Sequence, residues 1–185
     1  MTERALVNAL SSGDWSKAER ILRRATAKRS ATAGDHYNLG KVLLEQDKAA
    51  AAIISFRKAI ALKTDYQSAW FELGRAALRR RDYAVAEDAF SKAAALNPSD
   101  RDAKLNLARV AIRRGSWEAA RVALDGAIGP EAAALRYRAL AETRSPNAAP
   151  ALAAMLADRA ARPHGLRAMV RTSKGRIPLT SPRAV

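Results

Sequence analysis

Apolar and small residues recur along most of the chain with the period of an α-helix. Trp70, Leu73 and Ala77, and then Phe90 and Ala93, follow one another at intervals of three and four residues. Such spacing places the side chains on one stripe of a helix. Polar turns divide the pattern into segments of roughly 12–14 residues, a usual helix length. These turns are Gly13-Asp14, Gln46-Asp47-Lys48, Arg81-Asp82 and Gly115-Ser116. The pattern therefore predicts a series of paired helices.

The pattern repeats every 34 residues. Leu73-Gly74 has its counterparts in Leu39-Gly40 and Leu107-Ala108. The second helices share a further set of equivalent positions: Trp15, Ala18, Leu22 and Ala25; Ala52, Phe56 and Ala59; Tyr83, Ala86, Phe90 and Ala93; Trp117, Ala120, Leu124 and Ala127. Four units share one phase without an insertion, which indicates a repeat array.

Small residues stand where the two helices of a unit are expected to meet. Gly74 and Ala86 have almost no side chain, so two helix axes can approach to the short end of the usual ~8–10 Å range. We expect Phe56 and Phe90 to fill the space toward the next unit. The segment 97–100, Asn-Pro-Ser-Asp, ends one helix and offers a capping side chain to the next.

These residues resemble the tetratricopeptide repeat (TPR), in which W-x2-L-G is followed at fixed offsets by a small residue, Y, A, F, A and P. The resemblance implies an all-α fold, a right-handed α-solenoid of TPR helical hairpins with a degenerate C-terminal capping hairpin. Residues 67–100 match the pattern nearly completely, and residues 1–32 match only in the second helix. We expect the solenoid to span residues 1–161, with repeats at about 1–32, 33–66, 67–100 and 101–128.

The regular pattern ends after Pro130. Residues 131–143 and 148–161 are two Ala-rich helical segments, and we expect them to form the degenerate hairpin 131–161 that covers the last repeat. Residues 162–185 contain several Lys and Arg, no acid, and frequent Pro and Gly. We predict that this segment is a flexible basic tail.

Composition agrees with an all-α protein and excludes several other classes. The chain has 185 residues, of which 44 are Ala, the best helix former. The absence of Cys excludes disulfides, thiolate metal sites and cysteine catalysis. No apolar run is typical of a secretory signal or long enough for a transmembrane segment. We therefore expect a soluble cytoplasmic protein.

No set of residues typical of an active site is found. The two histidines are His36, at a packing position of a first helix, and His164, in the predicted tail. No Ser-His-Asp set, pair of carboxylates on one helix face or phosphate-binding Gly loop can be assembled. Asp14, Asp47 and Asp82 recur at the turns, and we assign them turn and cap roles. The sequence thus predicts no enzyme activity, no cofactor and no metal.

The first helices of the units carry a regular set of polar and apolar side chains. Lys41, Arg75 and Arg109 are spaced by 34, so they hold equivalent positions, ~10 Å apart on stacked helices. In TPR proteins the first helices line a concave groove that binds peptides or partner helices, so the resemblance implies a groove here. The candidate groove residues are Tyr37, Asn38, Lys41, Phe71, Arg75, Arg79, Leu105, Asn106, Arg109 and Arg113.

The same cations are also compatible with a solvated face. Two unit charges ~10 Å apart repel by only about 0.4 kcal/mol in water, and less with salt. Pairs such as Lys41 with Glu45, or Glu72 with Arg75, are placed to neutralise part of the charge.

The net charge of +15 bears on the partners, which should be acidic proteins, nucleic acids or anionic surfaces. The leading hypothesis is a non-enzymatic interaction module, a scaffold or adaptor that binds an acidic or amphipathic segment of another protein. One alternative is nucleic-acid or anionic-surface binding, which we expect to be non-specific because exposed aromatic residues do not alternate with the cations. Another is a regulatory repeat array of a multi-protein enzyme system. The partner and the oligomeric state are left open.

Overall fold

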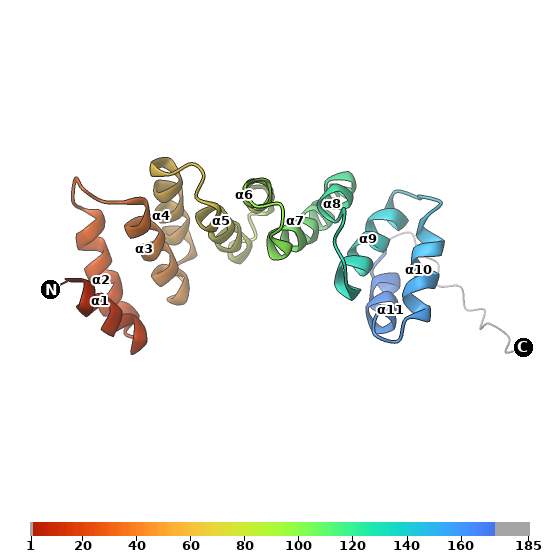
Figure 1. Cartoon of the computed structure of the whole chain (residues 1–185), viewed down its shortest axis with the longest axis horizontal. Coiled ribbons are helices and arrows are strands. Elements are labelled where there is room, and N and C mark those ends of the chain that lie inside the picture. The colour runs from red at the N-terminus through yellow and green to blue at the C-terminus, as the bar shows by residue number, and fades with distance from the viewer. Residues whose placement is uncertain (1, 173–185) are drawn as a thin grey trace, which may run out of the picture. The chain divides into compact units, whose positions relative to one another are not determined.

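The structure is a computed structural model that describes residues 2–172. This part of the chain forms eleven helices and no strand (Figure 1), which confirms the predicted all-α class. No helix in it is long and apolar enough to cross a membrane. The helices are α1 (Thr2–Ser11), α2 (Trp15–Thr26), α3 (Ala33–Glu45), α4 (Ala49–Leu62), α5 (Gln67–Arg79), α6 (Tyr83–Leu96), α7 (Arg101–Arg114), α8 (Trp117–Ala123), α9 (Pro130–Glu142), α10 (Ala148–Ala157) and α11 (Arg162–Val170).

The chain divides into two compact units, Met1–Ala103 and Lys104–Val185, and the boundary lies within α7. The N-terminal unit contains three helical hairpins, α1–α2, α3–α4 and α5–α6, and the first residues of α7. Within it α2 packs against α3, and α4 against α5, so each hairpin covers a face of the next. The C-terminal unit contains the rest of α7 and α8 to α11.

The turns inside the hairpins keep the 34-residue period in their backbone angles. The residue with positive φ in these turns is Gly13 (70°), Asp47 (57°), Arg81 (59°) and Gly115 (78°). Gly adopts this left-handed conformation without strain, and Asp tolerates it better than most residues. The next helix is then capped by a side chain in two of the four turns, where Asp14 accepts from the Lys17 backbone N–H and Asp82 from that of Val85. The turns and these cap roles were predicted from the sequence.

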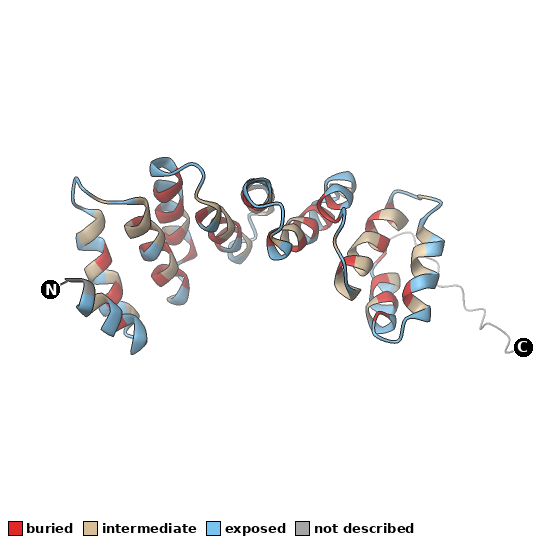
Figure 2. Ribbon diagram, in the orientation of Figure 1, coloured by how far each residue is buried: buried red, intermediate tan, exposed pale blue. Residues whose placement is uncertain are grey.

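In each of two N-terminal hairpins, α3–α4 and α5–α6, a phenylalanine ring of the second helix packs on a glycine of the first; we call this the ring-on-glycine contact. A Cβ atom built on Gly40 would lie 2.5 Å from the Phe56 ring, and one on Gly74 would lie 2.8 Å from the Phe90 ring. Both rings are fully buried. We expected them to fill the space toward the next unit; each ring also lies directly against the first helix of its own hairpin. Figure 2 shows the buried residues on the sides of the helices that face one another.

The C-terminal unit keeps the 34-residue register but has different residues at the positions where the helices of a hairpin meet. Ala108 stands at the position of Gly74, and the fully buried Leu124 stands at that of Phe90. The second helix of this repeat, α8, has only seven residues. The chain then passes through Gly126 and Gly129, both with positive φ, into α9. The regular hairpin therefore ends early.

The predicted flexible tail is wrong for residues 162–172, because α11 packs against both α9 and α10. Ala161 and Ala168 are buried in a cluster with Tyr137 and Met155. Gly165 brings the backbones close, since a Cβ on it would lie 3.3 Å from the Cβ of Met155. These small residues follow at intervals of four and three, so they form a narrow packing stripe that a search for large apolar residues misses. The cap of this unit thus includes α11 as well as α9 and α10. The remainder of the predicted tail, residues 173–185, lies outside the described residues.

Candidate functional site

Two of the predicted groove cations meet at one buried carboxylate. Glu72 on α5 has a side chain only 7% exposed. Its Oε1 lies 2.8 Å from the Nζ of Lys41 on α3, and its Oε2 lies 3.0 Å from an Nη of Arg75 on α5. The sequence indicated the pair of Glu72 with Arg75, but Lys41 pairs with Glu72 across the helices instead of with Glu45. This cluster ties the second hairpin to the third, and its net charge is +1.

The third cation of this unit, Arg79, also binds groups of the chain itself. Its guanidinium donates to the backbone carbonyl of Leu44, and an Nη lies 3.7 Å from a carboxylate oxygen of Asp47. Leu44 is in the last turn of α3, and its carbonyl also accepts from the backbone N–H of Asp47 at 3.0 Å. Arg79 therefore joins the end of α5 to the turn that follows α3.

The remaining predicted cations lie on α7 in the C-terminal unit. Arg109 donates to the Oδ1 of Asn106 at 2.8 Å, and its Nε lies 3.0 Å from the Oε1 of Glu131 on α9. Arg113 is exposed one turn further along α7. Leu105 is 5% exposed and packs with Leu124, so it supports the surface from beneath.

The aromatic members of the predicted set are half-buried and packed in the N-terminal unit. The Tyr37 ring lies 5.0 Å from that of Tyr66 and 6.0 Å from that of Phe56, between ring centroids. The Phe71 ring meets that of Phe90 edge-on at 5.5 Å. Burial raises the pKa of the Tyr37 phenol, and the neighbouring Glu72 carboxylate raises it further. The phenol is therefore neutral at physiological pH and can donate a hydrogen bond.

Three of the predicted residues line one hollow of the N-terminal unit, which we call the Tyr37 hollow. It has a volume of about 300 Å³ and lies between α1, the start of α2, and α3. Its lining is mainly apolar, with an amide, a cation and an acid among the polar groups. The lining residues are Leu10, Trp15, Tyr37, Asn38, Lys41, Val42 and Glu45. Leu10 was not in the predicted set because the first repeat shows the pattern only in its second helix. Trp15 was recognised as a repeat position of the second helices and was not assigned to the groove.

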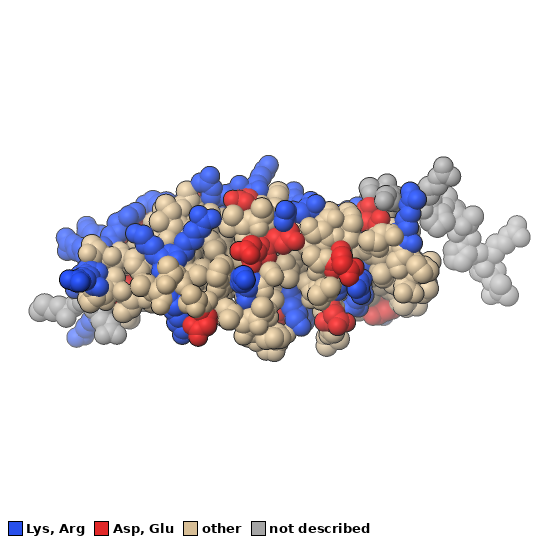
Figure 3. All heavy atoms as spheres, turned by 90° about the horizontal axis from the view of Figure 1, so that it is seen from above, with Lys and Arg blue, Asp and Glu red and all other residues tan. Residues whose placement is uncertain are grey.

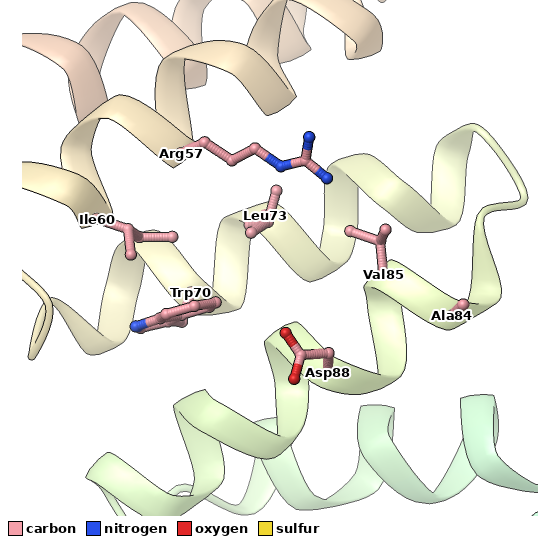
Figure 4. Close-up of a pocket in the computed structure, with 7 residues that line it drawn as sticks. All are labelled: Arg57, Ile60, Trp70, Leu73, Ala84, Val85 and Asp88. Atoms are coloured by element: carbon pink, nitrogen blue, oxygen red, sulfur yellow. The ribbon is translucent and has the colours of Figure 1, made fainter.

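A second hollow of the same unit, the Trp70 hollow, contains none of the predicted site residues. It lies between α4, α5 and α6 and has a volume of about 340 Å³. Figure 4 shows the guanidinium of Arg57 extending over Leu73 and the carboxylate of Asp88 turned toward Trp70. The indole N–H of Trp70 donates to the Thr64 carbonyl at 2.9 Å, so the ring is fixed.

A third hollow, the Arg138 hollow, belongs to the C-terminal unit and was missed by the sequence analysis. It has a volume of about 240 Å³ and lies between α9 and α11. Four basic side chains line it: Arg138, His164, Arg167 and Arg171. The one available signal was the four-residue interval between Arg167 and Arg171, which places both on one side of a helix. Because residues 162–185 were predicted to be a flexible tail, this interval was not assigned to a helix.

A basic face lies on α2. Lys17, Arg20 and Arg24 are exposed at intervals of three and four residues, so they project from one side of this helix. The acid on α2, Glu19, binds Arg23 and Lys48 at 2.7 Å. Figure 3 shows Lys and Arg side chains gathered toward the N-terminal end of the face in view.

Among the described residues, we consider the side chains that are suited to acid–base or metal chemistry. His36 is buried, and burial lowers its pKa, with a further lowering by Lys58. A neutral imidazole in this position agrees with the predicted packing role. Within residues 2–172, no group of three or more His, Asp or Glu side chains is placed to hold a metal ion.

The chain belongs to the tetratricopeptide repeat family, whose model matches residues 6–66 and 71–133. A search of curated proteins found no match. Among solved structures, MamA is similar with a TM-score of 0.74 and 20% identity, over 97% of this chain and 96% of that one. YrrB, described as a TPR protein with an unusual peptide-binding site, has a TM-score of 0.75 and 16% identity, over 88% and 87% of the two chains. The first TPR of Spaghetti (RPAP3), bound to the HSP90 peptide SRMEEVD, has a TM-score of 0.58 and 16% identity, over 62% and 90%. These likenesses show the fold that the sequence predicted.

Proposed function

We propose that the protein is a non-enzymatic interaction module that binds a segment of another protein along the first helices of its repeats. The observation that carries this proposal is the Tyr37 hollow, where three of the predicted groove residues surround an apolar space. Its volume is at the lower end of the range typical of ligand pockets. A hollow of this size suits one apolar side chain of a bound segment.

The polar groups around the Tyr37 hollow suit the backbone of such a segment. Asn38 is exposed, and its amide offers both donors and an acceptor to a peptide bond. The Tyr37 phenol can add a donor. Family neighbours support this use, since YrrB is described as having a peptide-binding site and the Spaghetti TPR is bound to a peptide. The peptide SRMEEVD contains both apolar and acidic residues.

We propose an amphipathic segment as the ligand, in preference to a strongly acidic one. Nearby acids partly neutralise the predicted cations of the N-terminal unit, so the positive field of these cations is weaker than the sequence alone indicated. The cations are Lys41, Arg75 and Arg79, and the acids are Glu45, Asp47 and Glu72. A single carboxylate beside Lys41 remains favourable, because the Lys41–Glu72–Arg75 cluster keeps a charge of +1. Binding should then depend on apolar contact more than on salt.

The decisive experiment blocks the Tyr37 hollow without disturbing the core. Peptides selected from a displayed library against the wild-type protein serve as the probe, and their Kd is measured by calorimetry. Asn38→Trp adds a large side chain at an exposed position of the lining and is expected to weaken binding at least tenfold, about 1.4 kcal/mol. Ala84→Trp adds the same side chain at an exposed position of the Trp70 hollow, and we expect less than a twofold change. The opposite result would place the site in the Trp70 hollow and refute the proposal.

Reversing a charge in the proposed peptide groove would affect stability as well as binding. Arg75→Glu would place a second carboxylate beside the buried Glu72, so a loss of binding would be confused with a loss of stability. Arg75→Gln removes the charge and keeps a hydrogen-bond donor. We expect this variant to change peptide affinity by less than Asn38→Trp does.

The basic face of α2 supports a second, non-specific activity. Lys17, Arg20 and Arg24 are available to phosphate groups of nucleic acids or to other anionic surfaces. Such binding is purely electrostatic and falls steeply as salt is added. It therefore differs from peptide binding in its salt dependence.

A further inference from the structure

The Arg138 hollow combines several cations with apolar contact. Arg138 projects from α9, and Arg167 and Arg171 project from α11 on the other side of the hollow. His164 lies one turn before Arg167 and adds a ring nitrogen that can donate. The apolar part of the lining is Ala134, Leu135 and Ala168.

Within the described residues, no acid neutralises these three guanidinium groups. The one acid of the lining is Glu131, whose carboxylate is already bound by Arg109 of α7. Within residues 2–172, Arg138, Arg167 and Arg171 form no ion pair, and residues 173–185 contain no Asp or Glu. The hollow therefore carries an excess of three positive charges, whereas the cations on α3 and α5 share Glu72.

Arg138 also has a hydrogen-bond donor without a partner among the described residues. Its Nε–H is buried and has no acceptor within the described part of the chain. A buried donor without an acceptor is unfavourable, and native structures rarely keep one. An oxyanion in the hollow would supply acceptors to this side chain after a small change of its rotamer.

The packing of α11 fixes the backbone positions of its arginines, whose side chains are exposed. The buried small residues of α11 hold it against α9 and α10, so Arg167 and Arg171 are presented on an ordered backbone. Like charges four residues apart on a helix repel. A bound anion between them and Arg138 would remove that repulsion, and the planar guanidinium fork loses less side-chain freedom per hydrogen bond formed than a lysine side chain does.

We propose that the Arg138 hollow binds a phosphate group, carried by a small molecule or by a phosphorylated residue. A phosphate monoester has a charge of about −1.5 to −2 and three terminal oxygens, which match three guanidinium groups. A carboxylate has one charge and two oxygens, which a single Arg satisfies. Leu135, Ala134 and Ala168 contact the group that carries the phosphate. This site is separate from the proposed peptide groove and does not depend on it.

The experiment titrates the full chain with inorganic phosphate and follows backbone amides by NMR at constant ionic strength. We expect shifts confined to α9 and α11. Arg167→Gln with Arg171→Gln should raise the Kd at least tenfold, and Arg138→Lys should raise it severalfold, because it keeps the charge but loses the planar fork. Both α11 arginines are exposed, so the helical melt should be unchanged.

A matched control distinguishes a built site from general charge. Arg29→Gln with Lys92→Gln removes the same charge from two exposed positions that line none of the three hollows and should change the Kd by less than twofold. An equal weakening by this control, or equal shifts produced by acetate, would show an adventitious ion only and would overturn the proposal. A blocked phosphoserine peptide and a nucleoside monophosphate then identify the carrier, since the source that fits should bind more tightly than inorganic phosphate.

Discussion

The two units use the same repeat register but different packing. In the N-terminal unit Phe56 and Phe90 lie directly on Gly40 and Gly74, at distances that leave no room for a methyl group. In the C-terminal unit an Ala and a Leu hold the equivalent positions, α8 is short, and the core is completed by α9 to α11. The comparison teaches that the register sets which helices meet, while the side chains at a few positions decide how tightly they do so.

The two units also differ in whether their basic side chains pair with carboxylates. Around Glu72, and around Glu19 on α2, one carboxylate is shared between two basic side chains. Around the Arg138 hollow the arginines have no acid of their own within the described residues. Shared carboxylates favour a structural role, since they fix neighbouring helices. Unshared arginines on an ordered helix favour a ligand.

The largest expected effect is the truncation of a buried ring. Phe90→Ala should lower the free energy of unfolding by about 3–5 kcal/mol, because it leaves a cavity above Gly74. Leu124→Ala, at the equivalent position of the C-terminal unit, removes fewer atoms and should cost less. Urea unfolding followed by circular dichroism measures both. Ile54→Ala, at a 58% exposed position, is the control and should change the value by less than about 0.5 kcal/mol. A Leu124 effect as large as that of Phe90 would remove the distinction between the units.

The next effect tests the ring-on-glycine contact directly. Gly40→Ala should destabilise the protein by about 1–3 kcal/mol, since the new methyl group overlaps the Phe56 ring. Gly34 lies on the same helix, and its Cβ would meet only the Thr32 hydroxyl at 3.6 Å. Gly34→Ala should therefore stabilise the helix by about 0.5–1 kcal/mol. Thermal melts of the two variants should move in opposite directions. A shift of the same sign in both would contradict the contact.

The smallest effect concerns a shared carboxylate. Hydrogen bonds from Lys48, and then from Arg23 and Gln46, lower the pKa of Glu19 to about 2 in spite of partial burial. Because this pKa is below that of the unfolded chain, the stabilisation is complete above pH 4.5 and is lost as the pH falls from there toward 2. We expect a contribution of about 1 kcal/mol after allowance for solvent screening.

Glu19→Gln provides the measurement. The difference in melting temperature between wild type and this variant should be constant above pH 4.5 and should shrink as the pH falls below it. Glu45→Gln, which removes an exposed carboxylate from the next hairpin, should not show this change. A constant difference for Glu19→Gln across the acid range would rule out the proposed sharing.

Most of the fold could be predicted because a helical repeat is specified locally. The interval of three and four residues fixed the helices, and the polar turns fixed their ends within a few residues. Asp82 and Gly115 stand where the turns were placed. Ion pairs within one helix could also be predicted, as the pair of Glu72 with Arg75 shows.

Contacts between different helices were harder to predict from the sequence. The partner of Lys41 turned out to be Glu72 on α5, since its side chain reaches across to the next hairpin. Leu105, predicted to face a ligand, is buried because the neighbouring Leu124 and Ala132 pack over it. Neither outcome follows from spacing along the chain, because both depend on the angle at which two helices meet.

Periodicity along the chain was sufficient to predict most of the helices, their 34-residue register, the small residues at the crossings and the family. Those features depend on interactions within a few turns of one helix, which periodicity records. The packing of helices against one another decided that α11 is ordered against α9 and α10, where the hollows lie, and which cations share an acid. These depend on small residues and long side chains that meet across helices far apart in the chain, where the packing of the two surfaces decides the outcome.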